Sequence, residues 1–132
     1  MTASRNRLAD AVNDQLEPKN SNDHTIPYLH WWPKKGTMEW VQYDFKNEQT
    51  VSRTALYWLD DSGEGECRLP RSWRVLYRVG DEWKPIENST PYVTQKDRYC
   101  EVTFKSVKTT AVRVELQLEP DFSAGIYEWN VE

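Results

Sequence analysis

Alternation of apolar and polar residues predicts a series of short β-strands along most of this chain. The alternation is clearest over residues 110–118, where every second side chain is apolar: Val112, Val114, Leu116 and Leu118. Alternation, or a high content of β-branched and aromatic residues, predicts further strands at 38–45, 51–59, 72–79, 82–86, 99–104 and 126–131. Gly80-Asp81 is typical of a two-residue hairpin turn. Only residues 7–14, with Leu8 and Val12 four apart, look helical.

Strands at this spacing, separated by Pro and Gly turns, indicate an all-β antiparallel sandwich or barrel. The chain has 132 residues, of which 38% are hydrophobic and 13% aromatic, so it carries enough large side chains for one folded core. No internal repeat, low-complexity run or linker interrupts the pattern, and we expect residues 1–132 to form a single domain.

The charge pattern limits the classes of partner. The formal net charge is −4, from 17 basic and 21 acidic residues that are well mixed. Nucleic-acid-binding domains are typically basic, and binding to a membrane surface needs a polybasic patch, so we expect neither partner. The chain also lacks the roughly 18 consecutive apolar residues of a membrane span. Residues 1–7 hold no apolar core of a signal peptide. The chain is then either a cytoplasmic protein or a piece of a longer exported chain, and we expect the exported piece.

Three connections hold the candidate functional residues. The connection at 17–36 is long for a compact domain, which favours a functional role. The connection at 60–70 is acidic with a single arginine, and the one at 119–125 precedes the last expected strand. The third contains Phe122, and a large apolar residue in such a loop is either a plug or a ligand contact.

The rings of the first connection are candidates for a sugar platform, because the apolar C–H face of a sugar packs on aromatic side chains: Tyr28, His30, Trp31 and Trp32. The alternative is that these rings cap the open end of the sandwich. We favour the cap for Trp32, because Pro33 and a strand follow, and both interpretations stay open for His30 and Trp31. The other tryptophans of interest lie on expected strands and are predicted in the core or on a sheet surface: Trp40, Trp58, Trp73 and Trp129.

Polar residues of the 60–70 connection allow two chemistries. Asp61, Glu66 and Arg68 can supply the donors and acceptors that sugar hydroxyls need. An acid/base pair among the carboxylates of Asp60, Asp61, Glu64 and Glu66 would instead make a stand-alone hydrolase. Such pairs normally lie in a deep cleft, so we favour a solvated acidic loop. The chain has no G-x-S-x-G motif, and its two histidines lack the spacing of a metalloprotease pair.

The remaining candidates for covalent or metal chemistry are the two cysteines and a group of oxygen-bearing side chains. Cys67 and Cys100 are the only cysteines, and they could form a disulfide or remain two unlinked thiols. We favour unlinked thiols, because the sequence shows no disulfide framework. A calcium site is conceivable around Asn13, Asp14 and Glu128, although calcium takes six to eight oxygens and the chain lacks a dense Asp/Asn loop.

Read together, several segments resemble a known family. Residues 39–45 (EWVQYDF), 57–61 (YWLDD) and 70–77 (PRSWRVLY) look like the discoidin-like, factor V/VIII C-type, galactose-binding-domain fold, over nearly the whole chain. A closer resemblance is to the accessory domain at the C-terminal end of some bacterial β-L-arabinofuranosidase-like glycoside hydrolases. That resemblance is carried by residues 17–23 (EPKNSND), 31–33 (WWP), 35–37 (KGT), 65–68 (GECR) with Pro70, and 122–126 (FSAGI).

The resemblance implies a jelly-roll β-sandwich of about eight strands, with sugar bound on the loops at one end. Phe122 fits the aromatic that lies near the last strand in sugar-binding members. The residues that would face the ligand with it are His30, Trp31, Asp61, Glu66 and Arg68. Many members hold a structural calcium, for which Asn13, Asp14 and Glu128 are the matching positions, although Gln15 replaces the glycine of the family pattern.

We therefore expect a non-catalytic, carbohydrate-binding-like accessory module of a secreted glycoside hydrolase, with a glycan and the parent catalytic domain as partners and a periplasmic or extracellular location. The alternative is a structural brace between domains that binds no sugar. A sugar site needs polar groups that converge on an exposed ring, whereas a brace presents a broad apolar patch.

Overall fold

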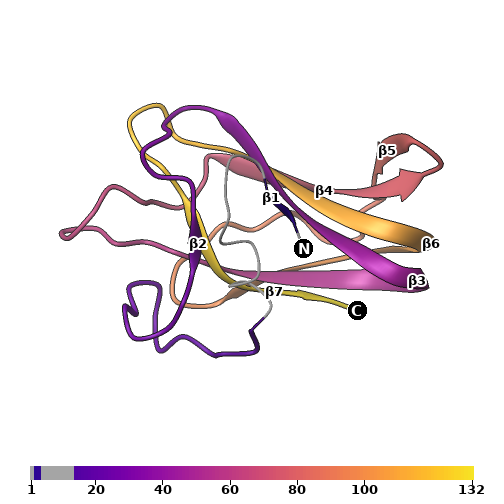
Figure 1. The fold of residues 1–132 in the computed structure, drawn as a ribbon, viewed down its shortest axis with the longest axis horizontal. Coiled ribbons are helices and arrows are strands. Elements are labelled where there is room, and N and C mark those ends of the chain that lie inside the picture. The colour runs from indigo at the N-terminus through magenta and orange to yellow at the C-terminus, as the bar shows by residue number, and fades with distance from the viewer. Residues whose placement is uncertain (1, 4–13) are drawn as a thin grey trace.

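The computed structural model describes residues 2–3 and 14–132, and this part of the chain is all β (Figure 1). The strands are β1 (Thr2–Ala3), β2 (Leu29–His30), β3 (Met38–Trp58), β4 (Ser72–Val79), β5 (Glu82–Pro85), β6 (Tyr99–Gln117) and β7 (Gly125–Val131). The helix expected at 7–14 lies outside the described residues, apart from Asp14. Over 2–3 and 14–132, no helix is long and apolar enough to cross a membrane.

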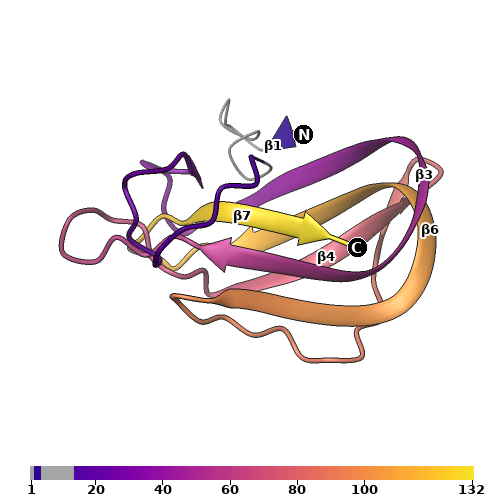
Figure 2. The same cartoon turned by 90° about the horizontal axis from the view of Figure 1, so that it is seen from below.

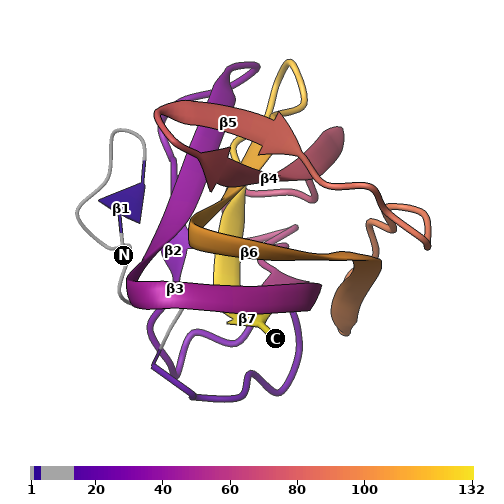
Figure 3. The same cartoon turned by 90° about the vertical axis from the view of Figure 1, so that its right-hand side faces the viewer.

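β3 and β6 are each one long strand where the sequence pattern predicted two. Both strands bend at the same end of the molecule, and their pairing continues around the corner from Gln49↔Thr109 to Val51↔Val107, with register shifts on either side (Figure 3). Residues 46–50 are all exposed there, so the corner carries the polar residues that are typical of a loop. The division into two strands was therefore wrong, because backbone pairing persists where the apolar alternation stops.

The bends place the two halves of β3 and β6 in different layers of an antiparallel jelly-roll sandwich. The first half of β3 pairs with β1 and with the second half of β6, which continues to β4 and β5. The second half of β3 pairs with the first half of β6 and with β7 (Figure 2). β7 in turn pairs with β2. The expected all-β sandwich fold is confirmed.

The main core fills the space between the two layers. The alternation predicted for 110–118 is confirmed. Arg113, Glu115 and Gln117 are half-buried on one face, and the apolar side chains of the other face are buried: Val112, Val114, Leu116 and Leu118. Trp58, Trp73 and Trp129 are also buried, as expected. Trp40 is half-buried on a sheet surface, where the guanidinium of Arg113 lies 4.3 Å from its ring centre.

A second apolar cluster covers the outer face of the β7 layer. Its buried members are Tyr57, Leu59, Cys67 and Tyr127, and Ile26, Tyr28 and Tyr99 pack against them. Because apolar residues cover both of its faces, β7 is buried over 125–129 instead of alternating.

The two cysteines are free and buried in different places, which confirms the unlinked interpretation. Cys67 belongs to the outer cluster, and Cys100 belongs to the main core. Burial raises the pKa of the Cys67 thiol to about 12, so this thiol is protonated and unreactive near neutral pH.

Candidate functional site

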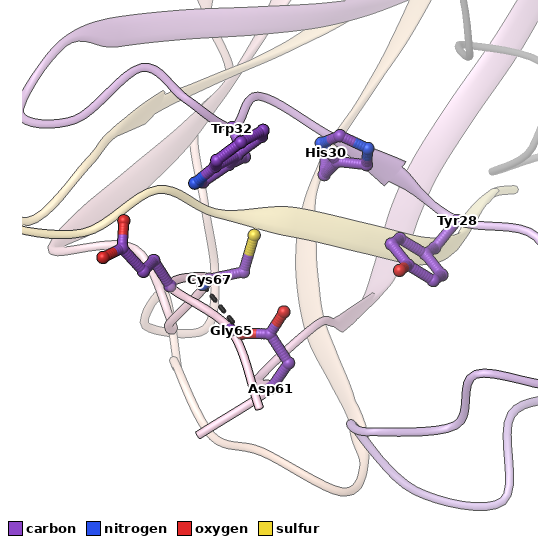
Figure 4. A pocket seen from close by; sticks show the side chains of 7 residues that line it. Tyr28, His30, Trp32, Asp61, Gly65 and Cys67 are labelled. Carbon is purple, nitrogen blue, oxygen red and sulfur yellow. Dashed lines mark hydrogen bonds between the residues drawn. The ribbon is translucent and has the colours of Figure 1, made fainter. Parts of the chain in front are cut away.

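The connections 17–36, 60–70 and 119–125 gather at the end of the sandwich opposite the bends of β3 and β6 (Figure 1). A pocket of about 230 Å³ opens among them, lined by Tyr28, His30, Trp32, Asp61, Gly65, Glu66 and Cys67. Figure 4 shows the Tyr28, His30 and Trp32 rings along one wall and Asp61 with Cys67 on the facing wall.

Strand pairing decides which rings face this pocket. β2 pairs with β7 (Leu29↔Ile126), and the Trp31 N–H donates to Ala124 O at 3.0 Å, so the extended alternation continues past the strand. Leu29 and Trp31 therefore point into the main core. On the opposite side are the three ring residues that line the pocket: Tyr28, His30 and Trp32.

Two expectations for the tryptophan pair are corrected by this alternation. Trp31 is only 2% exposed and packs in the main core, so its ring is not accessible to a ligand. Trp32 was expected to cap the sandwich, but it is 54% exposed and lines the pocket. The ring available for stacking is that of Trp32.

Asp61 organises the acidic connection around its own carboxylate. Its Oδ1 accepts the Cys67 N–H at 2.8 Å, and its carbonyl accepts the N–H groups of Glu64 (2.9 Å) and Gly65 (2.8 Å). A Cβ on Gly65 would lie 2.3 Å from Asp61 Oδ2, so only glycine leaves room for the carboxylate in this position. The turn thereby fixes the Asp61 side chain in the pocket wall.

Arg68 and Phe122 join the second and third connections behind the pocket. Arg68 Nη1 donates to Gly65 O and Cys67 O, both at 2.9 Å, and its guanidinium lies 4.6 Å from the Phe122 ring centre. Backbone hydrogen bonds from Ser123 N to Glu66 O and from Arg68 N to Ser123 O add to this link. Neither Arg68 nor Phe122 is in the lining of this pocket, and their expected contact with a ligand stays a prediction.

Glu66 lies at the exposed rim. Its carboxylate pairs with Lys35 Nζ at 2.5 Å. That hydrogen bond and charge lower the pKa of Glu66, with smaller contributions from a hydrogen bond to Trp32 and the charge of Arg68. Glu66 is therefore ionised and lies beside the Trp32 ring.

The other carboxylate of the acidic connection is directed elsewhere. Glu64 pairs with His24 Nε2 at 2.7 Å, and both side chains are largely exposed. Glu64 does not line the pocket, so Glu64 and Glu66 do not face a common cleft. This placement fits the solvated-loop interpretation.

The expected calcium position is partly within the described residues. Asn13 lies outside them, while Asp14 Oδ2 and Glu128 Oε2 are buried without a hydrogen-bond partner. Burial, followed by the charges of Asp14 and Glu17, raises the pKa of Glu128 to about 7. Across 14–132 no three His, Cys, Asp or Glu side chains are grouped as a metal site, so two carboxyl groups fit a cation only in part.

No protein-family model matches the sequence, and no curated protein matches it. Solved structures do resemble the fold. A chain from a study of the Streptococcus pneumoniae β-galactosidase BgaA matches with a TM-score of 0.83 and 18% identity, covering 98% of this chain and 88% of that one. A Clostridium perfringens module, CBM32-5, in complex with GalNAc-β-1,3-galactose, matches with a TM-score of 0.69 and 14% identity, covering 98% and 91%.

Chitosan-binding module 1 from a chitosanase/glucanase of Paenibacillus sp. IK-5 matches with a TM-score of 0.65 and 20% identity, covering 99% of this chain and 92% of that one. At these identities the likeness concerns the fold alone. The chain has the galactose-binding-domain-like β-sandwich fold that these carbohydrate-binding modules share.

Proposed function

We propose that this domain is a non-catalytic carbohydrate-binding module, and that the pocket at its loop end receives one sugar residue. The observation that carries the proposal is the exposed Trp32 ring beside two polar side chains of the second connection, Asp61 and Glu66. A sugar needs this combination, because its C–H face packs on a ring while its hydroxyls need fixed donors and acceptors. A volume of about 230 Å³ suits a single ring, since sites for drug-sized ligands hold roughly 300–1,000 Å³.

The proposed roles follow from position. Trp32 is the stacking platform, and Asp61 in the facing wall and Glu66 at the rim accept hydrogen bonds from sugar hydroxyls. Tyr28 and His30 complete the wall with groups that can donate or accept. Arg68 and Phe122 hold the loops together behind the ligand. Affinity is expected to be weak, because one shallow site buries little area.

The resemblance in the loop segments supports a parent chain that is an exported, β-L-arabinofuranosidase-like glycoside hydrolase, with this domain as its accessory module. In that setting the module would hold a glycan close to the catalytic domain. The names of the structural neighbours, which include a galactose-containing disaccharide and chitosan as ligands, support a glycan as the ligand class.

The brace alternative is less well supported by the exposed surface. Of the four large apolar residues exposed in the described chain, Trp32 lies at the loop end and Val79 at the end of β4, close to the opposite end (Figure 1). Trp32 and Val79 therefore do not belong to one broad apolar patch of the kind that docking against a domain requires.

The test is a glycan array probed with the wild-type domain and with Trp32→Ala. Binding to a defined set of glycans that Trp32→Ala abolishes would support the module. Absence of binding at high protein concentration, with folding confirmed by circular dichroism, would contradict it and favour the brace.

A further inference from the structure

The wall of the pocket is acidic and aromatic. Two carboxylates, Asp61 and Glu66, line it together with the rings of Tyr28 and Trp32. No lysine or arginine of residues 14–132 belongs to the lining. Carboxylates and the faces of aromatic rings both attract a cationic group, whereas they repel an anionic one.

Asp61 offers an acceptor that the protein itself does not use. The residue is 9% exposed, and its Oδ1 accepts the Cys67 N–H at 2.8 Å, with Arg68 Nη1 at 3.5 Å. The hydrogen bonds and the ion pair of the Asp61 carboxylate with described residues all involve Oδ1, and Figure 4 shows the other carboxylate oxygen directed into the cavity. Oδ2 is not among the buried side-chain oxygens without a partner, so solvent reaches it from the cavity, and a ligand donor can reach it in the same way.

The nearby cations are held outside the cavity. Lys35 Nζ is 2.5 Å from Glu66 Oε2 at the exposed rim. Arg68 is held behind the wall by the carbonyl oxygens of Gly65 and Cys67 and by the Phe122 ring. Arg68 pairs with Asp61 through Oδ1 at 3.5 Å, and among the described residues no ion pair involves Asp61 Oδ2, which leaves this oxygen for a charged donor.

We propose that the pocket selects a sugar residue with a free, protonated amino group, whose ammonium donates to Asp61 Oδ2 while its ring lies on Trp32. This inference rests on the proposed function and names its ligand class. Hydrogen bonds to charged groups are worth more than neutral ones, which predicts a preference of about tenfold over the matching neutral sugar.

Calorimetric titration with three β-1,4-linked oligosaccharides of equal length tests the proposal: glucosamine, N-acetylglucosamine and glucose oligomers. An oligogalacturonate serves as the anionic arm. We expect the glucosamine oligomer to bind about tenfold more tightly than the two neutral oligomers, and the oligogalacturonate to bind most weakly. Equal affinity for the three β-1,4-linked oligomers, or a preference for the oligogalacturonate, would overturn the inference.

Two substitutions sharpen this test. Asp61→Asn keeps an oxygen for the Cys67 N–H but removes the charge, and it should bring the affinity for the glucosamine oligomer to the neutral level. Lys35→Met releases the Glu66 carboxylate, and it should tighten binding of the glucosamine oligomer severalfold and by more than binding of the glucose oligomer. Lys34→Met is the matched control, because Lys34 is a neighbouring exposed lysine outside the pocket lining.

These experiments distinguish failure of the amino-sugar proposal from failure of the carbohydrate-binding proposal. Binding of neutral oligomers with no gain from the amine would overturn the inference and leave the carbohydrate-binding proposal standing. Silence toward all four oligosaccharides and on the glycan array would overturn both. If Asp61→Asn fails to fold, the Lys35→Met result alone decides, since an unchanged affinity for the glucosamine oligomer would contradict the proposal.

Discussion

Arg68 and Phe122 form a cation–π contact of 4.6 Å between two loops that are far apart in the sequence. The same Arg68 Nη1 donates to two carbonyl oxygens of its own loop, Gly65 O and Cys67 O. One face of Phe122 is thereby covered by the guanidinium. Phe122, which the family resemblance places against the sugar, contacts Arg68 beside the pocket wall, and its contact with a ligand stays a prediction.

We predict that Arg68→Ala lowers the stability of the domain, because Arg68 links two loops and does not itself line the pocket. The loss of two hydrogen bonds and the cation–π contact should lower the free energy of unfolding by about 1–3 kcal/mol. Urea denaturation checks the change, with Arg71→Ala as control, because Arg71 is exposed. An unchanged midpoint for Arg68→Ala would show that the contact does not support the loops.

The adjacent tryptophans are predicted to respond in opposite ways. Trp31→Ala removes a fully packed core ring and should cost about 3–5 kcal/mol of stability. Trp32→Ala should change stability by less than about 0.5 kcal/mol, because the ring is largely exposed, yet reduce glycan affinity about tenfold or more.

Thermal unfolding and glycan titration separate the two effects. Trp83→Ala is the matched control for Trp32→Ala: Trp83 is a half-buried ring on β5, 4.4 Å from the Arg113 guanidinium and remote from the pocket. It should leave glycan affinity unchanged. Loss of affinity with Phe122→Ala but not with Trp32→Ala would assign the platform to Phe122 instead.

Two glycines of one loop give a matched pair of substitutions. Gly65→Ala places a Cβ 2.3 Å from Asp61 Oδ2, so it should displace the carboxylate and abolish glycan binding. Gly63→Ala meets no atom within 4 Å but has a φ of +89°, so it should cost about 1 kcal/mol of stability and keep binding. Calorimetric titration of both variants checks this, and equal affinities would mean that Asp61 does not contact the ligand.

The strands could be predicted from the sequence because a period of two is visible wherever one face is buried. Continuity of β3 and β6 could not, since the exposed corner at 46–50 reads as a loop. In the site, His30, Asp61 and Glu66 do line one pocket, and their binding of a ligand stays a prediction. The alternation from Tyr28 to Trp32 was present in the sequence, but it became informative only once β2 was paired with β7, a strand from the other end of the chain.

We predict that calcium stabilises the domain by binding beside Asp14 and Glu128. Asp14 and Glu128 each leave a buried carboxylate oxygen unpaired, which a cation would satisfy. Calcium at about 100 times its dissociation constant should then stabilise the domain by about 2.7 kcal/mol relative to chelator. Thermal unfolding in calcium and in chelator measures this, and Glu128→Gln should remove the difference while Glu82→Gln, an exposed β5 variant, should keep it.

Asp23 lies in the 17–36 connection and should make the stability of the domain depend on pH in the acidic range. The Asp23 carboxylate accepts the N–H groups of Lys19 and Thr25, both at 3.0 Å, and the Thr25 hydroxyl at 2.5 Å. The Thr25 hydroxyl lowers the pKa of Asp23 most, followed by the two N–H groups, from 3.8 to about 2. These hydrogen bonds hold the loop in a defined turn between Lys19 and Thr25.

Because the pKa is lowered in the folded state, ionised Asp23 stabilises the fold above about pH 4, and this contribution is lost as the pH falls toward 2. Asp23→Asn should therefore be less stable than wild type at pH 6, and the difference should shrink between pH 4 and pH 2. Urea denaturation at a series of pH values measures the difference between the two proteins, which cancels the titration of the other carboxylates. Asp81→Asn, in the exposed β4–β5 turn, is the control. A difference that stays constant down to pH 2 would contradict the assigned role of Asp23, because the shift in its pKa requires that the charged form be the one that holds the loop.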